Sequence, residues 1–271
     1  MTEAEKFMQE LKAERKPHSA MSIEEYVKWQ DYLFNSAKGD GDCPKCNGKG
    51  YIQKSRLEKG FWYPVVYECE CLSKTKNEIR IKKSGLADVI ERYTFESFKT
   101  KEEWQKRLKA SAEKFAENPG NWFYVGGQSG CGKTHICTAI VKTLMEKGFE
   151  SKYIIWTEEI TKLKANKNKD EEYRQLIEPI ETAKVLYIDD FLKLPSGARS
   201  TPTQSDIMTA FEIINYRYNN RGRLITIISS EHTVEDLLYF DEALGSRIYE
   251  ASKGSRNIIK REDKRNYRMG I

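Results

Sequence analysis

Residues 127–134 read Gly-Gln-Ser-Gly-Cys-Gly-Lys-Thr, which satisfies the phosphate-loop pattern G-x-x-x-x-G-K-[ST] in full. An apolar segment, 122–125, precedes this loop, and a segment of helical character begins near Thr134. Glycines let the backbone turn its N–H groups toward phosphates, and the N-terminus of the following helix adds partial positive charge. The loop therefore predicts a nucleotide site between a strand and a helix.

The phosphate loop supplies two side chains with distinct expected roles. Lys133 should reach the β- and γ-phosphates, and the hydroxyl of Thr134 should be a ligand of Mg²⁺. Cys131 and Cys137 are more readily packed thiols than ligands. The residues expected to bind ATP or ADP are Gly127, Gln128, Ser129, Gly130, Cys131, Gly132, Lys133, Thr134 and His135.

A second acidic motif follows about fifty residues later. The apolar run 185–188 ends in Asp189 and Asp190. Asp189 is expected to hold Mg²⁺ through water, and Asp190 to orient or deprotonate the attacking water. The competing interpretation is a strand that ends in a solvated Asp-Asp turn.

The order of apolar and amphipathic segments indicates the fold class. Short apolar runs at 122–125, 152–156, 185–188 and 224–228 alternate with longer helical stretches. Such alternation predicts an α/β domain with a parallel sheet between helices. With 39% hydrophobic and 32% charged residues, the chain has enough apolar material for one sizeable core under a charged surface.

Two further polar sites follow the last predicted strand. Ser230 or Glu231, at its end, is positioned to sense the γ-phosphate. Arg247 follows a short predicted helix, and an arginine offered across a subunit interface can stabilise transition-state charge. The alternative for Arg247 is a surface salt bridge.

Four cysteines ahead of the phosphate loop form a C-x₂-C pair and a C-x-C pair, separated by twenty-two residues. Four thiolates can close a tetrahedral zinc site, so we expect zinc ligands at Cys43, Cys46, Cys69 and Cys71. The C-x-C half is tight, which leaves open that His18 replaces one of its cysteines, and a redox or metal-free arrangement is the other alternative. The run 61–67 between the pairs predicts a strand, whose aromatic residues either pack on the site or stack on bases.

Charge and hydropathy limit the compartments and partners that we expect for this protein. No run approaches the roughly 18 apolar residues of a spanning helix, and the first ten residues are charged, so we expect a cytoplasmic protein without a membrane partner. The net charge of +5 is carried entirely by residues 251–271. That basic tail either contacts nucleic-acid phosphates or is simply solvated.

The length of 271 residues suits a large domain and a small one. Residues 1–36 show charged helical character, and residues 72–92 are Lys-rich and helical. We therefore place the boundary near residue 86, with a helical, zinc-binding domain at 1–85 and the ATPase domain at 86–271.

Several motifs together resemble the bacterial and phage DnaC/DnaI-type helicase loaders, the AAA+ branch that also includes the IstB-type transposition helpers. The resemblance covers nearly everything after residue 93 and rests on the stretches 93–98, 127–135, 188–190, 211–218, 228–231 and 245–248. Departures occur at Asp190, where the pattern usually has Glu, and at Glu231, where it favours Asn. The 24 residues after Arg247 match the branch without a C-terminal helical lid.

The resemblance implies a P-loop AAA+ ATPase that engages single-stranded DNA and delivers the hexameric replicative helicase onto it. It implies that residues 1–85 grip the helicase and that the ATPase domain self-associates. Residues 157–183, with Lys162, Lys164, Lys167 and Lys169, are expected to contact DNA or to form a solvated helical face. An IstB-like transposition helper or another DNA-remodelling ATPase is the alternative function, and a small-molecule P-loop kinase is a further one.

Overall fold

The computed structural model describes residues 21–84, 87–193, 201–260 and 266. It divides into two compact units, residues 1–76 and 77–271, with the division inside helix α3 (Glu70–Ser84). The assignment of roles to residues 1–85 and 86–271 stays a prediction. None of the helices in the described ranges combines the length and apolar character needed to cross a bilayer.

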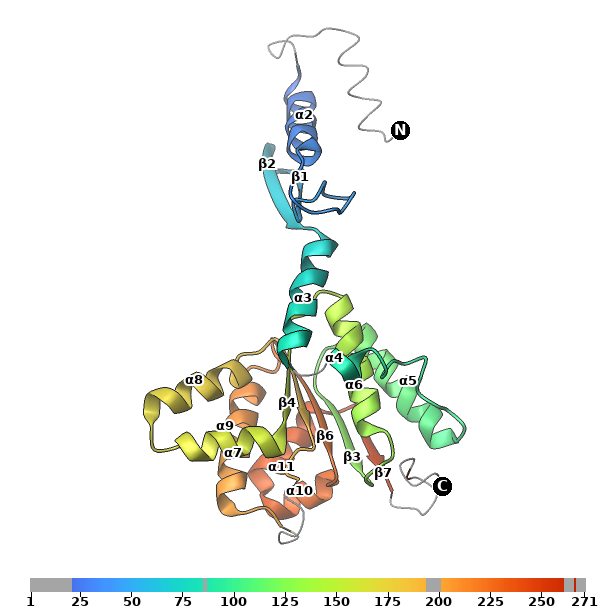
Figure 1. The fold of residues 1–271 in the computed structure, drawn as a ribbon, viewed down its shortest axis with the longest axis vertical. Coiled ribbons are helices and arrows are strands. Elements are labelled where there is room, and N and C mark those ends of the chain that lie inside the picture. The colour runs from blue at the N-terminus through green and yellow to red at the C-terminus, as the bar shows by residue number, and fades with distance from the viewer. Residues whose placement is uncertain (1–20, 85–86, 194–200, 261–265, 267–271) are drawn as a thin grey trace. The chain divides into compact units, whose positions relative to one another are not determined.

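The described part of unit 1 contains helix α2 (Ile23–Ser36), a two-stranded antiparallel hairpin and the start of α3 (Figure 1). Ser22 and Glu25 form a capping box that fixes the start of α2. The hairpin pairs β1 (Tyr51–Glu58) with β2 (Phe61–Glu68). The predicted strand at 61–67 is thus confirmed as β2, whereas the sequence did not predict β1.

Helix α2 covers the outer edge of β1. The Asn35 amide donates to the Gln53 carbonyl at 2.8 Å and accepts from its N–H at 2.9 Å. Asp31 accepts from the Ser55 N–H at 2.7 Å and from the side chains of Gln53 and Ser55, both at 2.8 Å. These side chains therefore replace the partner strand that an edge would otherwise lack.

Unit 2 is built around a five-stranded sheet of order β4-β5-β6-β3-β7, in which every pair is parallel. The predicted parallel sheet between helices is confirmed. Its strands are β3 (Phe123–Gly127), β4 (Ser151–Ile155), β5 (Val185–Asp189), β6 (Ile225–Ser230) and β7 (Arg256–Ile259). Strand β7 lies within the basic tail and was not predicted. Trp156, expected to end a strand, instead begins a helix because the chain turns away from the sheet there.

Helices cover both faces of the sheet (Figure 1). Helices α4 (Ala87–Ile90), α5 (Glu103–Glu117) and α6 (Lys133–Glu146) pack on the face that receives Phe123, Val125 and Tyr187. The other face is covered by α7 (Trp156–Asn166), α8 (Asp170–Glu181), α9 (Gln204–Asn219), α10 (Val234–Phe240) and α11 (Glu242–Ala251). Neighbouring strand residues point to opposite faces, so each buried strand contributes to both hydrophobic cores.

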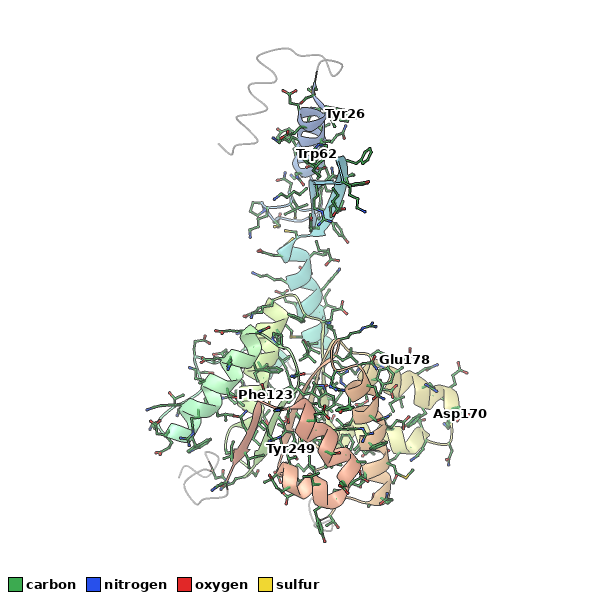
Figure 2. All side chains as sticks on the ribbon, turned by 180° about the vertical axis from the view of Figure 1, so that it is seen from behind. Tyr26, Trp62, Phe123, Asp170, Glu178 and Tyr249 are labelled. Carbon is green, nitrogen blue, oxygen red and sulfur yellow. The ribbon has the colours of Figure 1, made fainter. Side chains whose placement is uncertain are left out.

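Figure 2 shows the contrast between these interior residues and the charged outer surface. Phe123 on β3 is fully buried, whereas Asp170 and Glu178 on α8 are exposed. Because the strands are buried on both faces, they read as continuous apolar runs in the sequence. The carboxyl ends of β3, β5 and β6 meet at one edge of the sheet, and this edge carries the polar motifs.

Candidate nucleotide-binding site

The phosphate loop connects the end of β3 to the start of α6. Gly127, Gly130 and Gly132 have φ angles of 126°, 77° and 93°, values that residues with a Cβ rarely adopt. Gly132 is the N-cap of α6, and no side chain in the described ranges caps that helix. The first N–H groups of α6 are therefore available to an anion, as a phosphate site requires.

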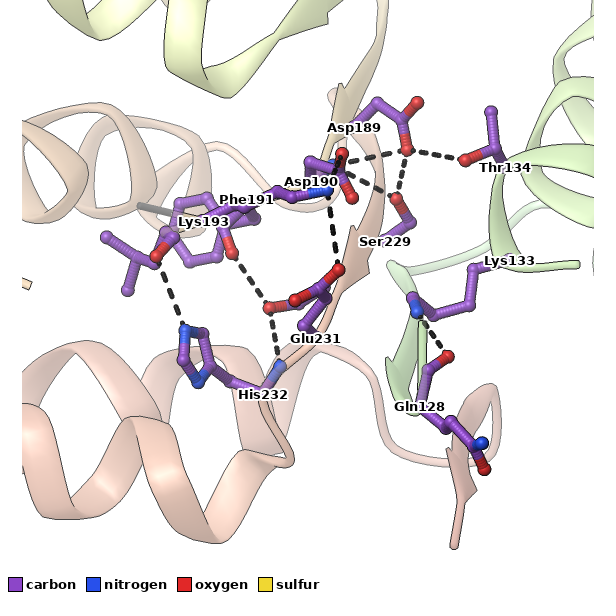
Figure 3. A network of polar contacts seen from close by, with 12 residues as sticks. Gln128, Lys133, Thr134, Asp189, Asp190, Phe191, Lys193, Ser229, Glu231 and His232 are labelled. Atoms are coloured by element: carbon purple, nitrogen blue, oxygen red, sulfur yellow. Dashed lines mark hydrogen bonds and ion pairs between the residues drawn. The ribbon is translucent and has the colours of Figure 1, made fainter. Parts of the chain in front are cut away.

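Lys133 is held against its own loop. Its ammonium donates to the carbonyls of Gly127 at 2.9 Å and Gln128 at 2.7 Å, and the residue is only 6% exposed (Figure 3). A phosphate oxygen can exchange with either carbonyl without displacing a carboxylate. The loop carbonyls thus hold the Lys133 ammonium at the pocket, and because they are neutral they leave its positive charge available to a phosphate.

Asp189, at the end of β5, is the centre of a dense hydrogen-bond network. Its Oδ1 accepts from the Thr134 hydroxyl at 3.2 Å and the Tyr187 hydroxyl at 2.8 Å, and also from the Ser229 hydroxyl. Its Oδ2 accepts from the Tyr153 hydroxyl at 3.2 Å. Thr134 and Asp189, the two expected Mg²⁺ ligands, are therefore brought together, and their oxygens are of the kind that Mg²⁺ prefers.

The two tyrosines beside Asp189 remain protonated donors. Burial raises the pKa of Tyr187 and of Tyr153, and the nearby Asp189 charge raises both further. Because a phenol that keeps its proton can only donate to the carboxylate, these contacts fix the Asp189 oxygens in place.

Asp190 points into the same pocket and forms an ion pair that the sequence did not predict. Lys193 donates to its Oδ2 at 2.8 Å and lies 3.3 Å from the Glu231 carboxylate (Figure 3). Burial acts to raise the pKa of Glu231, but the charge of Lys193, with Ser129 and Lys133, holds it below its ordinary value. Glu231 is therefore an anion near the phosphate loop.

The pocket that these groups line has a volume of about 410 Å³ and extends to residues 92–99. There the Tyr93 ring stacks on the His135 ring at 4.7 Å between centroids, and Phe98 meets His135 edge-on at 5.2 Å. His135 also contacts the Thr94 carbonyl at 2.9 Å, although burial lowers its pKa overall. One part of the pocket is thus aromatic and another is charged.

The sequence profile of the bacterial DnaA ATPase domain matches residues 89–252, more than half of the chain. The chain belongs to the bacterial DnaA ATPase-domain family. This DnaA-family chain accordingly binds nucleotide and is an ATPase.

Three proteins show similarity to this chain in sequence or in fold. The Bacillus subtilis (strain 168) protein YqaM is 31% identical over 214 residues, which cover 75% of this chain and 66% of YqaM. The DnaC helicase loader has a TM-score of 0.53 at 22% identity, over 64% of this chain and 98% of that chain. Replication initiator DnaA bound to AMPPCP and single-stranded DNA has a TM-score of 0.51 at 20% identity, over 65% of this chain and 51% of that chain.

These likenesses confirm the predicted P-loop AAA+ fold. The DnaA-family chain spans about half the length of that DnaA structure and nearly all of the DnaC loader. The resemblance to DnaC/DnaI-type helicase loaders, predicted from the motifs, is therefore confirmed at the level of the fold.

The two candidate sensor residues of this DnaA-family chain occupy different environments. Glu231 lines the pocket, whereas Ser230 is fully buried and donates to the Phe191 carbonyl at 2.8 Å. Ser229 contacts both acidic positions, since its hydroxyl donates to Asp189 and accepts from the Asp190 N–H at 3.2 Å. Ser229 was not predicted as a site residue, because the sequence at a strand end does not reveal which side chain faces the neighbouring strand.

Arg247 lies on α11 and is not among the residues that line the described pocket. Its guanidinium donates to Asn215 at 3.0 Å and to the Ala243 carbonyl at 2.8 Å, and it lies over the Phe211 ring at 4.9 Å. In the DnaA-family fold this arginine is thus held against α9 by polar and aromatic contacts.

The four cysteines of unit 1 converge on one point. All their Sγ atoms lie within 4.8 Å of one another, with 3.9 Å between Cys43 and Cys69 and 3.5 Å between Cys46 and Cys71. Tetrahedral zinc with Zn–S bonds of about 2.3 Å requires sulfur separations of roughly 3.8 Å. The Gly50 N–H donates to Cys46 Sγ at 3.2 Å. His18, the alternative ligand, lies outside the described residues.

Proposed function

We propose that this DnaA-family ATPase is a helicase loader, which binds the replicative DNA helicase and delivers it onto single-stranded DNA during replication initiation. The observation that carries the proposal is the fold shared with the DnaC helicase loader over 98% of that chain. Unit 1, which carries the four cysteines, also supports the proposal, because a loader needs a partner-binding surface besides its ATPase domain.

The proposed hydrolysis uses groups from three segments of unit 2. Lys133 and the N–H groups at the start of α6 bind the phosphates, and Thr134 and Asp189 hold Mg²⁺. When bound, Mg²⁺ neutralises charge that develops on the phosphate oxygens. Asp190 orients or deprotonates the attacking water. The aromatic wall at Tyr93 suits the purine base, since it offers an apolar, flat surface beside the phosphate loop.

Arg247 is proposed to act across an interface between two copies of the ATPase domain. Its contacts with Asn215 and Phe211 hold the guanidinium in one orientation, which reduces the entropy lost when it meets a phosphate. In the presence of single-stranded DNA, Arg247→Ala should lower DNA-stimulated ATPase turnover by about 10³-fold. Undiminished turnover would remove the interface role.

Single-stranded DNA is the proposed nucleic-acid partner. A DnaA of the same fold has been seen bound to AMPPCP and single-stranded DNA. On and after α7, Lys162, Lys167 and Lys169 are exposed, although Lys162 also pairs with Glu159, whereas Lys164 is partly buried in its ion pair with Asp206. Lysines at 162, 167 and 169 are therefore the better candidates for contacts with DNA phosphates.

Unit 1 is proposed to bind zinc through all four cysteines and to dock on the helicase. The sulfur separations match a tetrahedral site, and four thiolates leave no open position for chemistry. The β2 strand exposes Phe61 (67%) and Tyr63 (50%), apolar area of the kind that marks a protein interface. Zinc would thus be structural and hold the docking hairpin together.

The deciding experiment measures the mass of the protein mixed with the hexameric replicative helicase of its own cell, by light scattering with ATP and with ADP. We expect a stable complex that the double substitution Phe61→Ser and Tyr63→Ser abolishes. Tyr239→Ser is the matched control, since Tyr239 is 84% exposed on unit 2. A complex that survives the double substitution would remove the docking role of the hairpin.

The same experiment tests the alternative function. Absence of any complex with the wild-type chain, alongside intact ATP binding, would overturn the loader proposal and favour an IstB-like transposition helper. Lys133→Ala should abolish nucleotide binding in either case, because the remaining loop amides lack a full positive charge. Retained affinity in that variant would overturn the assignment of Lys133.

A further inference from the structure

Lys193 occupies the gap between two carboxylates at the charged end of the pocket. Its ammonium lies 2.8 Å from Asp190 and 3.3 Å from Glu231 (Figure 3). All three side chains are about one-third exposed, and all three line the nucleotide pocket. The lysine is therefore shared between residues that follow two different strands, β5 and β6.

The cluster of Asp190, Lys193 and Glu231 reduces the repulsion between the carboxylates of the pocket and a bound polyanion. Asp189, Asp190 and Glu231 place three carboxylates beside a pocket that takes a polyanion. Like charges that face one another in a partly water-excluded site repel strongly. Asp189 is compensated by hydrogen-bond donors and by the metal it is proposed to hold. Among the described residues, Lys193 is the cation that forms ion pairs with Asp190 and Glu231 and so compensates their charge.

The cluster lies in the part of the pocket where the terminal phosphates are expected. Glu231 lines the pocket together with Ser129 and Lys133 of the phosphate loop. Lys133 is the residue that reaches the β- and γ-phosphates in phosphate-loop enzymes. The repulsion therefore concerns the third phosphate of ATP more than the two phosphates of ADP, because charge repulsion falls with distance.

We propose that Lys193 is a specificity-determining residue: its ammonium neutralises Glu231 and positions Asp190, so that the pocket accepts the γ-phosphate of ATP. The ammonium has three hydrogen-bond donors, two of which serve Asp190 and Glu231 and one of which is available to a phosphate oxygen. Lys193 thereby makes ATP binding favourable in a site that carries Glu231. The inference rests on the proposed role of Asp190 and on the nucleotide site itself.

The test compares the dissociation constants of a non-hydrolysable ATP analogue and of ADP, each with Mg²⁺, by calorimetry on the full chain. Lys193→Met should weaken binding of the ATP analogue by at least about tenfold and of ADP by less than about threefold. Lys106→Met is the matched control, because Lys106 pairs with Glu103 at the same three-residue spacing, 2.6 Å apart and outside the pocket. The control should leave both constants unchanged.

A second substitution separates charge compensation from structural damage. Glu231→Gln in the Lys193→Met background should restore most of the lost affinity for the ATP analogue, since it removes the carboxylate that Lys193 neutralises. Lys193→Arg should keep the preference for ATP over ADP, and it keeps the proposal testable if Lys193→Met fails to fold. Equal weakening of both nucleotides, or no rescue by Glu231→Gln, would overturn the proposal.

The outcome also distinguishes this inference from the assignment of the nucleotide site. If Lys133→Ala abolishes binding of both nucleotides while Lys193→Met changes neither, the site stands and the role of Lys193 falls. If Lys133→Ala leaves both affinities intact, the phosphate site itself is misassigned and the inference falls with it.

Discussion

Each of the two units of the chain is stabilised internally by different interactions. In unit 2, two hydrophobic clusters fill the space on either side of a five-stranded sheet. In unit 1, the buried side chains among the described residues are those of Cys46 and Cys69. Small units cannot bury enough apolar surface to offset chain entropy, and they rely on metals or other cross-links. The comparison indicates that unit 1 depends on its cysteines in a way that unit 2 does not.

The largest effect should come from breaking the cysteine cluster. Cys46→Ser, or removal of zinc by a chelator, should unfold unit 1, because structural zinc contributes on the order of 10 kcal/mol in small domains. Hydrogen exchange should show loss of amide protection in β1 and β2 while the nucleotide affinity of unit 2 stays unchanged. Protected hairpin amides in the metal-free chain would contradict the comparison.

A large effect confined to unit 2 is expected for Arg217. This fully buried guanidinium donates to the carbonyls of Ile180, Glu181, Ala183 and Ile225 and to the Thr226 hydroxyl. Burial lowers its pKa to about 9, yet it stays charged at neutral pH.

Arg217→Met should lower the free energy of unfolding of unit 2 by about 3–5 kcal/mol, because it leaves buried carbonyls without donors. Calorimetry should show this loss in the transition of unit 2, with zinc content unchanged. Arg223→Met, at an exposed position, is the control and should change little. A loss below about 1 kcal/mol in Arg217→Met would mean that water replaces the guanidinium.

A moderate effect within unit 1 is expected for Asp31. Asp31→Ala removes three hydrogen bonds from the edge of β1 and should cost about 1–3 kcal/mol. Urea unfolding of the zinc-bound chain measures the loss. Ser36→Ala, at the exposed end of the same helix, is the control. An effect as large as that of Cys46→Ser would show that polar contacts, not the cysteine cluster, hold unit 1 together.

The smallest effect concerns the pH dependence of unit 2. Burial acts to raise the pKa of Asp206, but Lys164 and Thr203 outweigh it and lower the pKa below its ordinary value. The unfolded chain therefore binds the proton more readily, so this contribution to stability is complete above about pH 4 and is lost as the pH falls through the folded-state pKa.

Asp206→Asn should remove that acid dependence and cost about 1 kcal/mol at pH 7, since Asp206 also closes the capping box of α9. Thermal unfolding between pH 2 and pH 7 is the measurement. Lys164→Met should likewise reduce the acid dependence of stability. A slope that persists unchanged in both variants would assign it to other carboxylates.

Local sequence was sufficient to predict a feature whose function requires consecutive residues in one backbone conformation. The phosphate loop was recognisable because its glycines, Lys133 and Thr134 must follow one another at fixed spacing. Strand β7 was missed because its four residues are too short for a periodic signal and lie in a basic segment. Strand β1 was missed because alternating polar residues such as Gln53 and Ser55 look like a loop until Asp31 and Asn35 of α2 bond to them.

The sequence by itself determined the fold class, the phosphate loop, the acidic strand end and the four cysteines, since each depends on residue type and spacing along the chain. Only the tertiary structure decided which polar groups meet. It brought Ser229 rather than Ser230 to Asp189, placed Lys193 between Asp190 and Glu231, and set Arg247 against α9. These pairings join residues up to about forty positions apart. The first two follow from the order in which parallel strands lie side by side in the sheet, and the third follows from the packing of α11 on α9.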